Sequence, residues 1–179
     1  MLKKAAGEAE LNDIREIYEA SFPKSEKKPF ALILEKQEQG QAEILAITDS
    51  QGRVQGLSIM VLSGDLVLLD YFALDPRFRG AGVGSAVLGE LQERYGRDRL
   101  VVEIERTTGS GAEADNIQDR MRRKNFYLRN GMIPAEFCVD LMGVEMEVLT
   151  FGRKLTFEEY YSIYSRVFPK KIADKVRLV

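Results

Sequence analysis

The stretch Leu66–Ser85, LVLLDYFALDPRFRGAGVGS, constrains the fold most, because it reads as a buried strand that runs directly into a glycine-rich turn. Its first half is apolar up to Leu74, apart from Asp70, and Asp75-Pro76 ends the run. After the turn, apolar residues recur at helical spacing: Val83, Val87, Leu88 and Leu91. We therefore expect a helix to begin at the glycines, with its free N–H groups available to bind an anion.

The spacing of the glycines separates this turn from two other phosphate-binding loops. A P-loop ends in Gly-Lys-Ser/Thr, whereas Gly84 is followed here by Ser85 without a lysine. A dinucleotide fingerprint needs G-x-G-x-x-G, whereas the spacing here is G-x-G-x-G. Glycines let the backbone turn tightly and approach a ligand closely. The remaining alternative is a turn that only connects a strand to a helix.

The strand, the turn and the helix together resemble the acetyl-CoA pyrophosphate loop of the GNAT superfamily of N-acetyltransferases. The family pattern, Gln/Arg-x-x-Gly-x-Gly/Ala, is met by Arg79, Gly82 and Gly84. A second segment, Arg123–Met132, is similar to the family's F-Y-x-x-x-G-F segment, with Met in place of the final Phe. The two motifs occur in the family's order, and the resemblance covers about residues 66–139.

Length and composition indicate one globular domain, or one domain with a tail. The chain has 179 residues, of which 45% are hydrophobic and 30% charged, enough to bury a core. The net charge of −2 argues against a nucleic-acid partner. No apolar run approaches the ~20 residues of a membrane span, and the N-terminal MLKKAAGEAE lacks the apolar core of a signal peptide. We expect no membrane partner and a cytoplasmic protein.

The chain has one cysteine and no histidine, which excludes several kinds of site. Cys138 cannot form an internal disulfide or a cysteine-rich zinc cluster, and its strand-like surroundings favour buried packing over a nucleophile. Without histidine there is no Ser-His or Cys-His catalysis, and we expect no metal. General acid–base chemistry therefore falls to Asp, Glu, Tyr, Lys or water.

Periodicity and turn signals predict the order of the elements. Helices are expected over residues 11–22, 30–37, 116–130 and 156–168, the last beginning with a capping box at Thr156. Strands are expected over residues 43–48, 54–62, 66–74 and 100–105, with a hairpin over residues 135–151. The aromatic face of the last helix is expected to pack on the sheet; the alternative is a homodimer contact.

The resemblance implies an α+β GNAT fold. We expect a central mixed, mostly antiparallel sheet of six to seven strands with helices on both faces, plus a C-terminal helical extension. The domain would span residues 1–151, and residues 152–179 would be the extension, packed on the same domain.

The resemblance also implies the donor substrate, acetyl-CoA, and the residues that bind it. Backbone N–H groups of the glycine turn would hold the pyrophosphate, and a hydroxyl at the helix start would add a donor. The end of the central strand would offer its backbone to the pantetheine arm. The residues so implied are Phe72, Ala73, Leu74, Arg79, Gly80, Ala81, Gly82, Val83, Gly84 and Ser85.

Four side chains are candidates for catalysis and acceptor binding. Tyr127 matches the position of the family's general acid, which would protonate the departing thiolate; a core tyrosine is the alternative. Asp70 is a carboxylate on an otherwise apolar strand face, which is costly without a purpose, and Asp70 or Glu105 is our candidate general base. Glu103 shares its strand face with Glu105 and would help to bind a cationic amine.

The charged residues can also be interpreted as structural or solvent-exposed groups without a role in the site. Glu103 and Glu105 could pair with Arg106, Arg122 or Arg123 as structural ion pairs, and the basic run ahead of Tyr127 could be a solvated face. The lysine-rich segment of residues 24–28 could be a mobile lip on the acceptor side or an ordinary loop. Arg77 and Arg79 are better placed to meet phosphate charge.

The predicted function is direct transfer of an acetyl group from acetyl-CoA to a primary amine, with a small cationic molecule as the acceptor. The alternative is a catalytically silent GNAT-like module that binds or senses an acyl-CoA. A third possibility, an unrelated nucleotide-binding fold, would prefer ATP or NAD to CoA.

Overall fold

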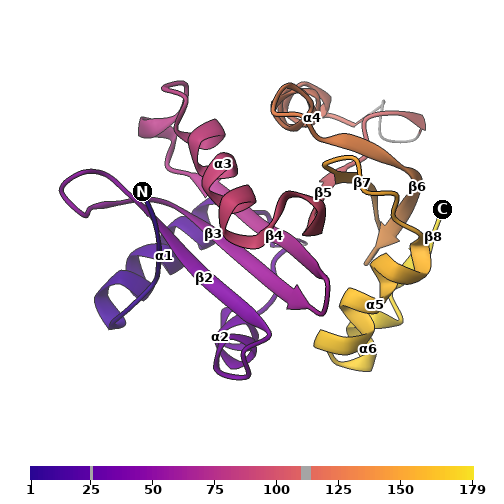
Figure 1. The fold of residues 1–179 in the computed structure, drawn as a ribbon, viewed down its shortest axis with the longest axis horizontal. Coiled ribbons are helices and arrows are strands. Elements are labelled where there is room, and N and C mark those ends of the chain that lie inside the picture. The colour runs from indigo at the N-terminus through magenta and orange to yellow at the C-terminus, as the bar shows by residue number, and fades with distance from the viewer. Residues whose placement is uncertain (25, 110–113) are drawn as a thin grey trace. The chain divides into compact units, whose positions relative to one another are not determined.

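The computed structural model describes residues 1–24, 26–109 and 114–179. Its strands are β1 (Leu2–Lys4), β2 (Ala42–Thr48), β3 (Val54–Ser63), β4 (Leu66–Leu74), β5 (Leu100–Glu105), β6 (Ile133–Leu141), β7 (Val144–Thr150) and β8 (Val176–Leu178). Its α-helices are α1 (Glu8–Ser21), α2 (Phe30–Glu38), α3 (Val83–Tyr95), α4 (Ile117–Arg129), α5 (Phe157–Val167) and α6 (Lys170–Ala173). The fold is α+β, with an eight-stranded, mostly antiparallel sheet (Figure 1).

The elements predicted from the sequence are confirmed, but the sheet is larger than the six to seven strands expected. The additional strands β1 and β8 contain three residues each, LKK and VRL. Such short strands carry no visible alternation of apolar and polar residues. Because β8 follows α6, the C-terminal extension is not purely helical, which corrects that prediction.

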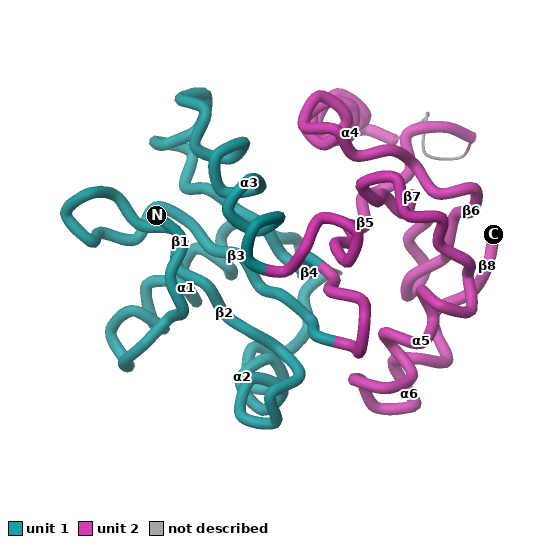
Figure 2. Tube along the Cα trace, in the orientation of Figure 1, with its two compact units in different colours: residues 1–62, 69–94 teal, residues 63–68, 95–179 magenta. Residues whose placement is uncertain are grey.

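The described chain forms two compact units (Figure 2). The first contains residues 1–62 and 69–94, and the second contains residues 63–68 and 95–179. Strand β4 therefore contributes its first residues to the second unit and the remainder to the first.

In the first unit the strand order is β1-β2-β3-β4. Helices α1 and α2 cover one face, where Ile14, Tyr18 and Phe30 pack against alternate strand residues such as Ile44 and Tyr71. Residues that point to the opposite face are also buried: Leu45, Ile47 and Met60. Helix α3 lies across that second face (Figure 1) and buries Val87, Leu88 and Leu91.

In the second unit the strand order is β5-β7-β6-β8, and all three pairings are antiparallel. The β6–β7 turn contains Met142 and Gly143, whose φ angles are 56° and 91°, at the position where the hairpin was predicted to turn. Cys138 lies in β6 and is half-buried, so the prediction that it is buried is wrong. The register shift between Pro134 and Cys138 twists this strand and exposes its first residues.

Helix α5 begins with the predicted capping box. The Thr156 hydroxyl accepts from the Glu159 N–H, and the Glu159 carboxylate accepts from the Thr156 N–H at 2.9 Å. The helix buries the face that carries Tyr160, Ile163 and Tyr164 within the second unit. The phenol hydroxyls of this face therefore need partners inside the unit.

Candidate functional site

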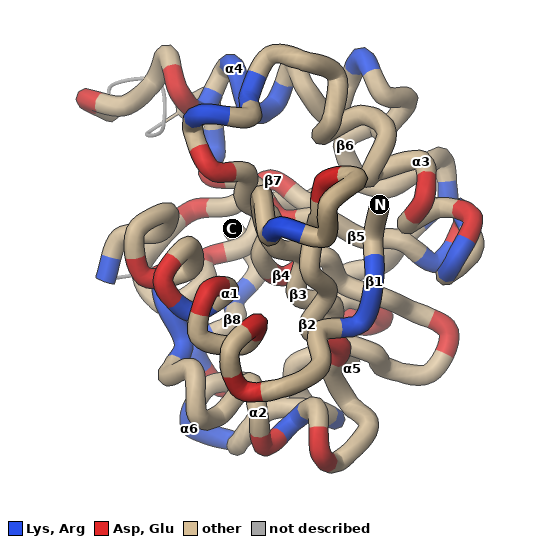
Figure 3. Tube along the Cα trace, turned by 90° about the vertical axis from the view of Figure 1, so that its left-hand side faces the viewer, with Lys and Arg blue, Asp and Glu red and all other residues tan. Residues whose placement is uncertain are grey.

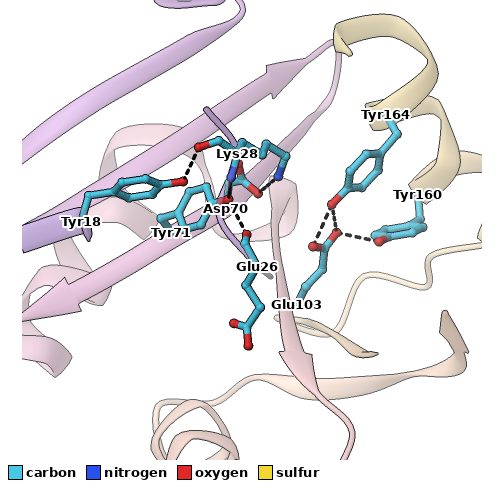
Figure 4. Close-up of polar contacts among 8 residues, drawn as sticks. All are labelled: Tyr18, Glu26, Lys28, Asp70, Tyr71, Glu103, Tyr160 and Tyr164. Atoms are coloured by element: carbon cyan, nitrogen blue, oxygen red, sulfur yellow. Dashed lines mark hydrogen bonds and ion pairs between the residues drawn. The ribbon is translucent and has the colours of Figure 1, made fainter. Parts of the chain in front are cut away.

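Asp70 lies on β4 in the first unit, and its carboxylate forms an ion pair with Lys28. The Lys28 ammonium is 2.7 Å from Asp70 Oδ1, and each side chain is 4% exposed (Figure 4). Sequence reasoning expected a carboxylate on an apolar strand face but did not find its partner, which is 42 residues away. A buried charge requires such a partner, because desolvation otherwise costs several kcal/mol.

Three further hydrogen bonds hold the same segment against α1 and β4. The Tyr18 hydroxyl donates to the Lys28 carbonyl at 2.9 Å, and the Lys28 N–H donates to the Tyr71 hydroxyl at 2.9 Å. The Tyr71 hydroxyl in turn donates to the Glu26 carbonyl at 2.8 Å (Figure 4). The expectation of a mobile lip over residues 24–28 is therefore wrong for Lys28, which is 5% exposed and fixed to the sheet.

The end of β4, where the pantetheine arm was predicted to bind, is closely approached by β3. A Cβ placed on Gly56 would lie 2.3 Å from the Ala73 carbonyl oxygen. The Asp75 N–H also donates to the Gln55 carbonyl at 2.8 Å. The absence of a side chain at Gly56 therefore lets β3 lie close to Ala73 and Leu74. The only sign of this contact in the sequence is a glycine within a predicted strand.

The glycine turn leads from the end of β4 into α3, as predicted. Gly80 and Gly82 have φ angles of 85° and 80°, and a Cβ placed on either would meet nothing within 4 Å. Helix α3 begins at Val83, so the N–H groups of its first turn have no intrahelical acceptors. The turn thus combines a left-handed backbone, open space and the positive end of a helix dipole, which suits a phosphate group.

The two arginines beside the turn have partners at the end of β4. Arg79 donates from Nε to the Leu74 carbonyl at 3.0 Å, which ties the turn to the end of β4. Arg77 pairs with Asp75 at 2.6 Å, and hydrogen bonds from the Arg77 side chain and N–H lower the pKa of Asp75 to about 2. Arg79 is exposed and lies where phosphate charge was predicted, whereas Arg77 is engaged by Asp75.

Glu103 lies on β5 in the second unit and is held by two tyrosines of α5. The Tyr160 hydroxyl donates to Oε1 at 2.6 Å, and the Tyr164 hydroxyl lies 2.9 Å from each carboxylate oxygen (Figure 4). Both tyrosines are fully buried, and Glu103 is half-buried. Helical spacing indicated the buried face of α5, but the bonds between its hydroxyls and β5 were not predicted.

Glu105, two residues further along β5, is engaged by arginines of α4. Arg120 and Arg123 each lie 2.8 Å from one of its carboxylate oxygens, and Glu105 is 4% exposed. The ion-pair alternative therefore holds for Glu105 and Arg123, whereas Arg106 pairs with Glu145 and Arg122 with Asp119. Figure 3 shows the Lys and Arg positions along α4 in blue.

A second buried carboxylate of this unit, Glu147 on β7, binds Lys124 and Thr107. The Lys124 ammonium is 2.5 Å from one oxygen, and the Thr107 N–H and hydroxyl donate to the other at 2.9 and 2.7 Å. Burial alone would raise the pKa of Glu147, but these hydrogen bonds outweigh it and lower the pKa below its ordinary value of 4.5. Lys124 therefore belongs to a structural network.

Tyr127 lies near the end of α4 and is 5% exposed. Its ring contacts Phe126 at 5.0 Å, edge to face, but its hydroxyl has no hydrogen-bond partner among residues 1–24, 26–109 and 114–179. Desolvation raises its pKa, and the positive charge of Arg123 partly opposes that shift. The hydroxyl thus keeps its proton near neutral pH, and the raised pKa makes it a weaker acid than an exposed tyrosine.

The predicted site residues fall into two groups. Asp70, the end of β4 and the glycine turn lie together in the first unit. Glu103, Glu105 and Tyr127 lie in the second unit. Sequence reasoning missed Lys28, Gly56, Tyr160 and Tyr164, which act through contacts between elements distant in the chain.

Within residues 1–24, 26–109 and 114–179, no three Cys, Asp or Glu side chains are grouped so that they could hold a metal ion. No helix in that same part of the chain combines the length and the apolar character that crossing a membrane requires.

Comparison with known proteins gives structural matches only, since no family model and no curated protein matches the chain. A Bacteroides thetaiotaomicron protein assigned to the GNAT acetyltransferase family is similar at a TM-score of 0.74 and 19% identity, over 97% of this chain and 98% of that one. Spermidine N-acetyltransferase from Vibrio cholerae, solved with CoA and spermine, is similar at a TM-score of 0.61 and 9% identity, over 83% and 92% of the two chains. An aminoglycoside 6'-N-acetyltransferase complexed with coenzyme A is similar at a TM-score of 0.64 and 12% identity, over 87% of this chain and 99% of that one.

Proposed function

We propose that this chain, which has the fold of the GNAT N-acetyltransferases, transfers an acetyl group from acetyl-CoA to a primary amine of a small cationic molecule. The observation that carries the proposal is the glycine turn, which joins the end of β4 to the start of α3 with Gly82 in a left-handed conformation. Two proteins of the same fold are named for spermidine and for aminoglycosides, both of which are cationic amines.

The donor would be bound mainly by backbone groups. The N–H groups from Arg79 to Gly84 would bind the pyrophosphate, Ser85 would add its hydroxyl, and Phe72, Ala73 and Leu74 would meet the pantetheine arm. The open space beside Gly80 and Gly82 supports this assignment, because a phosphate needs room next to the backbone. Acetyl-CoA supplies the activated acyl group, so no metal is needed in the scheme.

In the transfer, the amine nitrogen attacks the thioester carbon, a C–N bond forms and the C–S bond breaks. We assign Tyr127 the protonation of the departing sulfur, because its hydroxyl retains its proton near neutral pH. The ammonium proton would go to Asp70 or Glu105, directly or through water. Asp70 shares its carboxylate with Lys28, and Glu105 shares its carboxylate with two arginines, so either base would act from within an ion pair.

A calorimetric titration of acetyl-CoA into the purified protein tests the donor first, with ATP and NAD as controls. Saturable binding of acetyl-CoA alone is expected, and Arg79→Gln should weaken it in a salt-dependent manner. No binding of acetyl-CoA, or a preference for ATP or NAD, would contradict the proposal.

Free-thiol release with a panel of amines then tests transfer. We expect release that depends on both acetyl-CoA and an amine. Binding of acetyl-CoA without release by any amine of the panel would favour the silent acyl-CoA-binding module instead.

A further inference from the structure

The two oxygens of the Asp70 carboxylate on β4 differ in their surroundings. Oδ1 lies 2.7 Å from the Lys28 ammonium, and both side chains are 4% exposed (Figure 4). In the part of the chain that the structure describes, no group forms a hydrogen bond with the other oxygen, Oδ2. A general base needs an open lone pair of this kind, because it must accept a proton from the substrate.

Glu105 on β5, the other candidate base, has donors at both carboxylate oxygens. Arg120 lies 2.8 Å from Oε1, which also accepts from the Asn116 side chain at 3.3 Å. Arg123 lies 2.8 Å from Oε2. Both oxygens of Glu105 are thus engaged within the protein, whereas Oδ2 of Asp70 has no donor among the described residues. This difference favours Asp70 as the base.

Lys28 is held in place by contacts additional to its ion pair with Asp70. Its backbone N–H donates to the Tyr71 hydroxyl, and its carbonyl accepts from the Tyr18 hydroxyl, each at 2.9 Å. Its ammonium also lies over the Tyr71 ring, 5.3 Å from the centroid. Since Asp70 and Tyr71 are consecutive on β4, these contacts fix the ammonium at one point of the strand.

Tyr71, which binds Lys28, is itself fixed by aromatic packing. Its ring contacts the rings of Tyr18 at 4.8 Å and Phe22 at 4.9 Å, both edge to face. Its hydroxyl also donates to the Glu26 carbonyl at 2.8 Å, so it binds the segment at two points. Replacing a buried ion pair by apolar residues is often neutral for stability. Stability alone therefore gives no reason for a lysine at this position.

We propose that Asp70 is the general base, through Oδ2, and that Lys28 is a positioning residue, which binds Oδ1 and so fixes the orientation of the carboxylate. This inference rests on the proposed acetyltransferase function and deepens it. Tyr71 supports the same orientation indirectly, because it binds the backbone of Lys28.

In the transfer, the acceptor ammonium first gives one proton to Oδ2 of Asp70. The neutral nitrogen then attacks the thioester carbon, a C–N bond forms, and the C–S bond breaks with its electron pair leaving on sulfur. Tyr127 protonates the sulfur, and the second proton lost by nitrogen restores Tyr127 through solvent. Asp70 passes its proton to water, so the products are the amide, free CoA and one proton.

The test is a double-mutant cycle on kcat, with the amine of the panel that gives the fastest thiol release in the wild type. Asp70→Asn should lower kcat about 10²-fold or more, and Lys28→Met should lower it about tenfold. In the Asp70→Asn background, Lys28→Met should change kcat by less than about twofold, because Lys28 acts through Asp70. The affinity for acetyl-CoA should stay within about twofold of the wild type in each variant.

Lys27→Met is the matched control. Lys27 precedes Lys28 in the same segment, but its ammonium donates to the Glu19 carbonyl on α1 at 3.0 Å. The control should keep kcat within about twofold of the wild type. Calorimetric titration of acetyl-CoA gives the fraction of each preparation that binds the donor, and kcat is expressed per binding molecule, which corrects for partial unfolding.

Tyr71→Phe carries the test if Lys28→Met does not fold. It removes the hydroxyl that binds the Lys28 N–H and the Glu26 carbonyl but keeps the ring. The kcat should fall several-fold in the wild-type background. In the Asp70→Asn background, the same substitution should cause no further loss.

The outcomes distinguish this inference from the function on which it rests. Equal losses from Lys28→Met or Tyr71→Phe in the two backgrounds would overturn the inference, since a purely structural effect does not require Asp70. A kcat within twofold of the wild type in Asp70→Asn would also overturn it, while the acetyltransferase function stands. An absence of thiol release from the wild type with every amine of the panel would overturn the proposed function, and the inference with it.

Discussion

At the scale of single residues, the polar groups of this protein differ most in what they are bonded to. Asp70 is bound by an ammonium, Glu105 by two guanidinium groups and Glu103 by two hydroxyls. These partners set the electrostatic environment of each carboxylate. The Tyr127 hydroxyl, by contrast, has no hydrogen-bond partner in the described part of the chain.

Asp70→Asn should reduce turnover while the affinity for acetyl-CoA changes little, because the proposed donor contacts at the end of β4 come from the backbone. The same change removes the negative charge that lies 2.7 Å from the buried Lys28 ammonium, so the free energy of unfolding should fall by about 3 kcal/mol. Urea denaturation and steady-state kinetics measure the two effects separately.

The double variant Asp70→Leu/Lys28→Met distinguishes the two roles of Asp70. It removes both charges and should recover much of the lost stability. Turnover that recovers together with stability would assign Asp70 to structure. Turnover that stays low in a stable double variant would support a role in proton transfer.

Tyr127→Phe should reduce kcat by about 10²-fold or more, since general acid catalysis is worth that much. Because the hydroxyl has no partner in the described residues, the free energy of unfolding should change by less than about 0.5 kcal/mol. Single-turnover thiol release and urea denaturation give the two quantities. A kcat within twofold of the wild type would assign Tyr127 to the core, the alternative considered from the sequence.

At the scale of elements, α4 is joined to the sheet of its own unit through charges as well as apolar contacts. Arg120, Arg123 and Lys124 on α4 bind Glu105 on β5 and Glu147 on β7. The basic run, which the sequence allowed to be a solvated face, therefore directs some of its side chains toward the sheet. The contribution of the Lys124–Glu147 pair should depend on pH, because the pKa of Glu147 is lowered in the folded state.

Glu147 has a folded-state pKa below its ordinary value of 4.5, so its ionised form stabilises the fold. That stabilisation is complete above about pH 4.5 and is lost as the pH falls through the lower pKa of the folded state. The difference in free energy of unfolding between the wild type and Glu147→Gln should therefore be constant from about pH 7 to 5 and shrink below. Urea denaturation across this range measures it.

Glu136→Gln on the exposed part of β6 is the control for that experiment, and its stability difference should be small at every pH. A Glu147→Gln difference that grows on acidification would contradict the argument, because it would require a raised pKa in the folded state.

Helices, strands and turns were largely predictable, because each is encoded by residues close in the chain. The capping box at Thr156, the glycine turn and the hairpin at Met142-Gly143 all lie where local signals indicated. The partners of the charged side chains were not predictable. Lys28 and Asp70 are separated by 42 residues, and Tyr164 and Glu103 by 61. Periodicity predicts that such side chains face inward but does not show which ones meet.

At the scale of the whole molecule, binding of the donor should be visible as stabilisation. A ligand that binds only the folded state adds RT ln(1 + [L]/Kd), which is about 2.7 kcal/mol at a concentration of 100 Kd. For a chain of this size, the melting temperature should rise by several degrees with acetyl-CoA. Thermal scans at increasing acetyl-CoA test this expectation.

Gly82→Ala is the informative variant in those scans. Its φ of 80° is unfavourable for alanine, although a Cβ there has open space, so the free protein should lose about 1 kcal/mol. The stabilisation by acetyl-CoA should also shrink. A full response to acetyl-CoA in Gly82→Ala would show that the glycine turn does not bind the donor.

The hydrogen bonds from Tyr160 and Tyr164 to Glu103 should make the intrinsic fluorescence of this protein sensitive to changes at Glu103. The chain contains seven tyrosines and no tryptophan, so its intrinsic emission comes from phenol rings alone. A phenol that donates a hydrogen bond to a carboxylate is quenched, and the emission of Tyr160 and Tyr164 is therefore coupled to the electrostatic state of Glu103. A change in the charge around this carboxylate can therefore be followed in the native chain without any label.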